Sequence, residues 1–231
     1  MNRLLGCSPL AVALALAGCD GTATAPPLRP SFDAGGGQGL NLHAGAFGDG
    51  SLGAWKSQQG LPDNKGNGNF ALYLQKLTTT ATNAAAFAVI TGVEGQSFKD
   101  LSLSWLNRDD GHCGAGAPRW NVGVTGAGGT NYRVFLGCVY ANHSGDAPDG
   151  WMSDAFSHDE IVAQLLPDRV VAIGTTLPTD FAADIEGGMI TSLAIIFDEG
   201  TDTGPDFTGF VFLDNITVNG KIFTSPGDNG T

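Results

Sequence analysis

The sequence predicts an all-β protein, folded as a two-sheet antiparallel β-sandwich. Three observations support this fold class. Short segments of alternating apolar and polar residues recur along the chain, as strands with one buried face require. The 35 glycines are dispersed between these segments, which is typical of a fold with many turns. A single stretch carries helix signals, so strands are expected to build the core.

The N-terminal residues have the pattern of a targeting signal. Arg3 supplies a short basic region, and residues 10–16 form an apolar core too short to span a bilayer as a stable helix. Residues 16–19, Leu-Ala-Gly-Cys, resemble the bacterial lipobox. The resemblance implies a lipoprotein signal peptide over residues 1–18 and acyl chains on Cys19, which would anchor the protein to a membrane of the bacterial cell envelope on its extracytoplasmic side. The alternative is an ordinary signal peptide followed by an unmodified cysteine.

The rest of the chain is expected to be a short tether and one acidic domain. Residues 19–30 are rich in Gly, Thr, Ala and Pro, a composition typical of flexible tethers. Residues 31–231 contain no repeat of fixed period and no shift in composition, which indicates a single domain. Cleavage after residue 18 would remove one base and no acid, changing the net charge from −12 to −13. So acidic a surface repels nucleic acid and argues against it as a partner.

Strand signals are spread over the whole domain. The expected strands cover residues 30–33, 40–43, 69–77, 85–91, 97–106, 119–124, 132–136, 169–175, 189–197 and 207–218. In the strand from residue 97, Leu101, Leu103 and Trp105 alternate with serines. This half-buried pattern predicts that Trp105 packs in the core; stacking against a ligand is the alternative.

One short helix is expected near 158–166. Ser157 and Glu160 have the spacing of a capping box, and Pro167 follows the apolar run. Its length predicts a lid or crossover on a β scaffold.

The clearest pair of strands is a hairpin over residues 119–124 and 132–136. A glycine-rich turn separates them. Pairing Val122 with Val134 sets a register in which one face is apolar. That register places Trp120 opposite Leu136 and Val124 opposite Tyr132. The other face would carry Arg119, Asn121, Arg133 and Phe135.

Two cysteines flank this hairpin. Cys113 precedes it and Cys138 follows it, and in an exported protein such a pair is expected to form a disulfide. Closing this loop would stabilise the fold by about 3.5 kcal/mol in the chain-entropy treatment. The alternative is a pair of free or metal-binding thiols, although no CxxC or His/Cys spacing supports zinc.

Three short motifs carry a family resemblance. Ser-Phe-Asp at 31–33, Ala-Leu-Tyr-Leu-Gln at 71–75 and Phe-Leu-Asp-Asn-Ile-Thr-Val at 212–218 resemble the galactose-binding-like jelly rolls, which include many carbohydrate-binding modules. The resemblance implies a jelly-roll sandwich and a carbohydrate ligand. Residues 111–122 lie outside that pattern and resemble a motif of uncharacterised secreted bacterial proteins, which implies no activity.

The same resemblance implies a structural calcium ion. In those modules a calcium commonly joins the first and last strands, and the matching positions here are Asp33 and Asp214. Carbonyl oxygens and water would complete the six to eight oxygens that calcium takes. The alternative is that Asp214 and Asn215 hydrogen-bond neighbouring loops.

Three aromatic residues are candidates for ligand binding. Trp55, Tyr140 and Trp151 lie beside Gly, Asp and Asn in segments expected to be loops. Aromatic faces can stack on pyranose rings, so these residues could form a sugar site. The alternative is that each packs against the edge of its own domain.

No catalytic signature is present in the sequence. GxSxG, HExxH and Walker motifs are absent. His112, His143 and His158 lie near aspartates in the sequence, so a His/Asp site is one alternative. The acidic segment 198–206 departs from EF-hand spacing and is expected to be a solvated loop.

The sequence therefore favours a lipid-anchored, non-catalytic protein that binds a glycan or another surface ligand. Two alternatives remain open. One is a polysaccharide-active hydrolase or lyase that uses acidic loop residues, and the other is a structural envelope protein.

Overall fold

The computed structural model describes residues 39–62, 68–78, 84–108, 117–144, 147, 150–198 and 209–228. The predicted signal peptide, the tether, Cys19, Asp33 and Cys113 lie outside these ranges, so the predictions made for them stay predictions. Within the described ranges, no helix has the length and apolar character that crossing a membrane requires.

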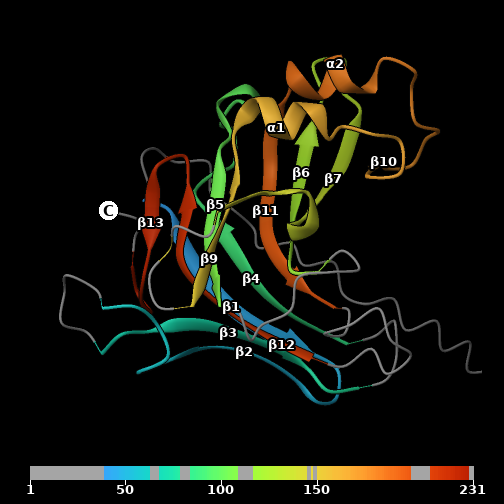
Figure 1. The fold of residues 1–231 in the computed structure, drawn as a ribbon. Helices are drawn as coiled ribbons and strands as arrows, with labels where there is room; N and C mark the ends of the chain where they lie inside the picture. Colours follow the sequence, from blue (N-terminus) through green and yellow to red (C-terminus); the bar gives the residue numbers. More distant parts are fainter. Residues whose placement is uncertain are drawn as a thin grey trace, which may run out of the picture. The chain divides into compact units, whose positions relative to one another are not determined.

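The described strands form two antiparallel sheets, which confirms the predicted all-β sandwich (Figure 1). Sheet A has the order β1 (Asn41–Phe47), β4 (Ala85–Thr91), β11 (Met189–Phe197), β6 (Arg119–Thr125), β7 (Asn131–Gly137) and β10 (Val170–Ala172). Sheet B has the order β2 (Ser51–Lys56), β3 (Ala71–Lys76), β12 (Gly209–Val218), β5 (Leu103–Arg108), β9 (Trp151–Phe156) and β8 (Asn142–Ser144), and β13 (Lys221–Phe223) pairs with β12.

The core lies between the inner faces of the two sheets. Trp105 of β5 and Trp120 of β6 stack there with ring centroids 5.0 Å apart. Trp105 is 1% exposed, which confirms that it is a core residue. The hairpin register is also confirmed, because Val122 pairs with Val134 and the predicted apolar face is buried.

Several elements differ from the prediction. β4 and β11 have the predicted bounds, but the segment from residue 97 first forms the 3₁₀ turn η1 (Phe98–Asp100), and β5 begins only at Leu103. A second 3₁₀ turn is η2 (Cys138–Tyr140). β2, β8, β9, β13 and α2 (Phe181–Glu186) were not predicted. The four strands are short or contain glycine, serine or aspartate, so their pairing partners, and not their local sequence, determine them.

Two short helices lie together at one end of the sandwich in Figure 1. The predicted helix is α1 (His158–Ala163), and both halves of its Ser157/Glu160 capping box form. The unpredicted α2 lacks a side-chain cap. Tertiary contacts hold α2 in its place, because Asp184 accepts hydrogen bonds from the Tyr132 hydroxyl at 2.7 Å and from the Gly128 N–H at 2.5 Å.

A buried carboxylate joins three strands of sheet B. Asp154 of β9 is fully buried and faces Trp105 across the strand pair. Its Oδ2 accepts a hydrogen bond from Trp105 Nε1 at 2.7 Å, and its Oδ1 lies 2.6 Å from His143 Nδ1 on β8. Because a buried charge needs such partners, this trio fixes the edge strand β8 to the core.

Candidate functional site

Three aromatic side chains meet on the outer face of sheet B. Tyr73 of β3 pairs directly with Phe212 of β12, and Phe210 lies two residues further along β12. The ring centroids are 4.7 Å apart for Tyr73 and Phe212, and 5.9 Å apart for Tyr73 and Phe210. Because side chains alternate along a strand, Leu72 and Leu74 point into the core while Tyr73 points outward. We call Tyr73, Phe210 and Phe212 the aromatic cluster.

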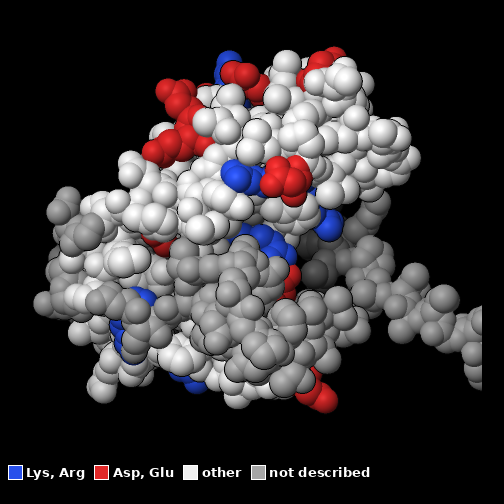
Figure 2. Space-filling model, turned by 45° about the vertical axis from the view of Figure 1, so that its right-hand side comes forward, with Lys and Arg blue, Asp and Glu red and all other residues white. Residues whose placement is uncertain are grey.

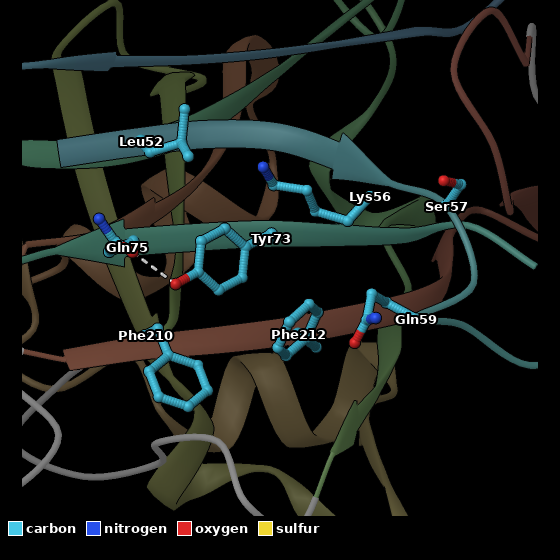
Figure 3. Close-up of a pocket in the computed structure, with 8 residues that line it drawn as sticks. All are labelled: Leu52, Lys56, Ser57, Gln59, Tyr73, Gln75, Phe210 and Phe212. Atoms are coloured by element: carbon cyan, nitrogen blue, oxygen red, sulfur yellow. Dashed lines mark hydrogen bonds between the residues drawn. The ribbon is translucent and has the colours of Figure 1, made fainter.

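A surface pocket of about 540 Å³ opens beside the aromatic cluster. Its lining comes from β2, β3, β12 and the segment that follows β2, as Figure 3 shows: Leu52, Lys56, Ser57, Gln59, Tyr73, Gln75, Phe210 and Phe212. The lining therefore combines aromatic rings with two amides, two hydroxyls and one ammonium group. This composition suits a ligand that has both apolar faces and many polar groups.

Polar groups at the pocket are arranged by short contacts. The Tyr73 hydroxyl donates to Gln75 Oε1 at 2.5 Å, and Gln75 Nε2 donates to the carbonyl oxygen of Gly50 at 3.2 Å. Burial raises the pKa of the Tyr73 phenol above its ordinary value of 10.0, so the hydroxyl remains a donor at neutral pH. Lys56 Nζ lies 5.7 Å from the centroid of the Tyr73 ring, within the range of a cation–π contact.

Residues 57–61 form one wall of the pocket. Hydrogen bonds from the N–H groups of Gln59 and Gly60 to the carbonyl oxygen of Asn69 anchor this segment. Arg108 supports it from β5, because its Nη1 lies 3.2 Å from both the carbonyl oxygen and Oε1 of Gln59. The Arg108 guanidinium also covers the Phe212 ring, with Cζ 4.2 Å from the centroid. One arginine therefore positions both the wall and part of the aromatic cluster.

Asp214 fastens the same wall from below. It is 1% exposed, and its two oxygens accept hydrogen bonds from the N–H groups of Leu61 and Asn215, each at 2.7 Å. Gly60 is required at this crossing, because a Cβ there would lie 2.0 Å from the carbonyl oxygen of Phe70. Asp33, the other predicted calcium ligand, lies outside the described residues, so the calcium site stays a prediction. Among the residues that the structure describes, no cluster of three or more His, Cys, Asp or Glu side chains could hold a metal ion.

The three aromatic residues predicted to bind ligand do not meet. Trp151 of β9 is 5% exposed and packs with Phe212 on the outer face of sheet B, next to the aromatic cluster. Trp55 faces inward from β2 and packs against the core. Tyr140 lies in η2, where the Arg169 guanidinium carbon is 3.4 Å from its ring centroid. A ligand-binding role for each of them stays a prediction, and Trp151 packs with Phe212 of the pocket lining.

The aromatic cluster was missed, although the sequence carried a signal for it. Phe210 and Phe212 alternate with Val211 and Leu213, which lie in the core. Both sets are apolar, so the strand is apolar on its two faces. A single-domain sandwich normally leaves its outer face polar, and an apolar outer face indicates a binding surface or a covered one.

Among the described residues, His143 and His158 have different carboxylate partners. His143 lies on β8 against Asp154, whereas His158 begins α1 and has Nε2 3.9 Å from Glu186 Oε1. His112 lies outside the described residues, as does most of the acidic segment 198–206. Asp198 itself is paired with Arg119, at 2.6 Å from Nη1. Cys138 is buried beside β7, and the disulfide with Cys113 stays a prediction.

The fold and the site define a class: a two-sheet β-sandwich protein with an aromatic and polar surface on one sheet. No protein-family model matches the chain, and no curated protein matches it significantly. Among solved structures, the chain is similar to a family 11 carbohydrate-binding module of the cellulosomal cellulase Lic26A-Cel5E of Clostridium thermocellum, with 14% identity, a TM-score of 0.39, and coverage of 80% of this chain and 90% of that chain.

A second similar structure is a family 11 module from Clostridium thermocellum in complex with a β-1,3-1,4-mixed-linked tetrasaccharide. It has 14% identity and a TM-score of 0.39, and the match covers 84% of this chain and 95% of that chain. At this level of similarity neither structure bears on the ligand of the present chain, so the argument below rests on the residues of the pocket.

Proposed function

We propose that this protein binds a carbohydrate on the outer face of sheet B and does not turn it over. The observation that carries the proposal is the aromatic cluster beside a pocket lined by amide and hydroxyl groups. A pyranose ring has an apolar C–H face that stacks on an aromatic ring, while its hydroxyls need donors and acceptors together. The side chains of Gln59, Gln75 and Tyr73 supply both kinds of group next to the rings.

The expected result is retention of the full chain, purified in detergent, on at least one soluble polysaccharide in affinity gel electrophoresis. Tyr73→Ala should weaken this retention about tenfold, because a stacking face of roughly 1.4 kcal/mol is lost. Phe135→Ala is the matched control, since it removes an aromatic ring of β7, which belongs to sheet A and does not line the pocket.

Two outcomes would count against the proposal. One is the absence of retention on every polysaccharide tested. The other is an equal loss in Phe135→Ala and Tyr73→Ala, which would show that the retention does not depend on the pocket.

The proposal includes a lipid anchor at Cys19, which would present this surface on the extracytoplasmic side of a membrane. Its support is the Leu-Ala-Gly-Cys sequence at residues 16–19. Cells grown with a labelled fatty acid should yield labelled protein in the membrane fraction. Cys19→Ser should abolish the label and release the chain from that fraction, and a label that persists in this variant would contradict the anchor.

A further inference from the structure

The charge at the pocket is opposite in sign to that of the whole chain. The protein has 23 Asp plus Glu against 11 Lys plus Arg. Lys56 is nevertheless the one charged residue among the described residues that line the pocket. The candidate site is therefore a cationic position on an acidic protein.

Lys56 has no carboxylate partner within the described part of the chain. None of the salt bridges formed there involves it. Figure 3 shows its side chain extending from β2 toward Tyr73, with the ammonium end beside that ring. Its nitrogen, 5.7 Å from the ring centroid, keeps its hydrogen-bond donors for other groups. A ligand that stacks on Tyr73 would bring its ring substituents within reach of this ammonium group.

The acidic groups of the described chain do not cancel this charge. Asp214 is buried under the wall of the pocket, where its Oδ2 accepts a hydrogen bond from the N–H of Leu61. Asp49 lies in the turn between β1 and β2, beyond Gln75. The exposed acids Asp159, Asp168, Asp180 and Glu186 belong to α1, α2 and the segments beside them, and the exposed Asp100 belongs to η1, which contacts α2.

These helices lie at the opposite end of the sandwich from β2 and β3 in Figure 1, and Figure 2 shows acidic side chains gathered at that end. At physiological ionic strength, charges are largely screened beyond about 8 Å. The acidic end therefore has little influence on a ligand in the pocket, and the local charge there decides the sign of the preference.

We infer that the ligand is a glycan that carries carboxylates, such as a polymer of uronic acids. This inference rests on the proposed function. Lys56 can donate a hydrogen bond to a hydroxyl of a neutral sugar, but a uronate adds the attraction between its carboxylate and the ammonium group, which a neutral sugar lacks. The ring of the same sugar stacks on Tyr73, so the ammonium group and the aromatic ring both contact one sugar unit of the polymer.

The test compares each acidic polymer with its own neutral form. Polygalacturonate, glucuronoxylan and alginate are each paired with the carboxyl-reduced polymer, which keeps the linkages and loses only the charge. Affinity of the full chain is expected to be about fivefold higher for the acidic member of every pair that is retained. Lys56→Met should bring that ratio to about one, because the acidic polymer loses its ion pair whereas the neutral polymer loses at most one hydrogen bond.

Two variants serve as controls. Lys99→Met removes a lysine from η1, near α2, and should leave the ratio as in the wild type. Tyr73→Ala should weaken both members of a pair by the same factor, because it removes stacking and leaves the charge.

The failures of the two proposals differ. Equal or better retention of the neutral polymers, or a ratio that Lys56→Met does not change, overturns the acidic ligand and leaves carbohydrate binding intact. The absence of retention on any polymer, acidic or neutral, overturns carbohydrate binding itself and the acidic ligand with it.

Discussion

Trp105→Ala is expected to lower the free energy of unfolding by about 5 kcal/mol. The Trp105 ring is stacked on Trp120 and lies edge-on to Phe156, with centroids 5.0 and 6.0 Å away. Removing it leaves a cavity between the sheets, and a buried Trp→Ala change costs about 3 to 5 kcal/mol. The change also removes the Trp105 N–H that donates a hydrogen bond to Asp154 Oδ2. A buried carboxylate that loses a donor destabilises the fold further. Urea unfolding followed by tryptophan fluorescence measures the change.

Trp105→Phe separates the two contributions. It keeps most of the ring packing and deletes the donor to Asp154, so a loss of about 2 kcal/mol is expected. Tyr140→Ala, at a 40% exposed position, should cost less than about 1 kcal/mol. If Trp105→Ala were no more destabilising than Trp105→Phe, the stacked pair would not be the centre of the core.

The roles of Trp105 and Asp154 were not equally predictable from the sequence. Trp105 lies in a segment in which apolar residues alternate with serines, and this local pattern is enough to place it in the core. Asp154 shows no such pattern, and an aspartate among glycines and serines is typical of a loop. Its burial follows from the pairing of β9 with β5, which brings it opposite Trp105. Such long-range pairing has no local signature, so neither β9 nor this hydrogen bond was predicted from the sequence.

In the candidate site, too, the local patterns were predictable from the sequence and the pairing of distant strands was not. The sequence places Trp55, Tyr140 and Trp151 in loops, where binding aromatics are often found. β2 is instead a strand, and its alternation turns Trp55 toward the core and Lys56 toward the pocket. Tyr73 and Phe212 become neighbours only because β3 pairs with β12 from the far end of the chain. A single sequence can indicate which face of each strand is apolar, but not which strands lie side by side.

Asp214→Ala is expected to lower the free energy of unfolding by about 3 kcal/mol and to weaken polysaccharide retention at least as much as Tyr73→Ala does. The change leaves the N–H groups of Leu61 and Asn215 without their acceptor at a site that is 1% exposed. An unsatisfied buried donor costs about 1 to 3 kcal/mol. Because Leu61 ends the wall that carries Ser57 and Gln59, the pocket should lose its shape together with stability.

Two variants and a chelator identify the cause of the Asp214 effect. Asp214→Asn keeps one acceptor oxygen, so about half of the loss is expected. Asp168→Ala removes a carboxylate that is 72% exposed and should have little effect on stability or retention.

A chelator distinguishes the hydrogen bonds of Asp214 from a role in binding metal. A calcium ion bound by Asp33 and Asp214 would contribute stability that is lost in EDTA and that is also lost in Asp33→Asn alone. The hydrogen bonds to Leu61 and Asn215 do not respond to a chelator. A loss of stability in Asp214→Ala that persists in EDTA therefore measures those bonds, and its disappearance in EDTA would assign the role of Asp214 to the metal.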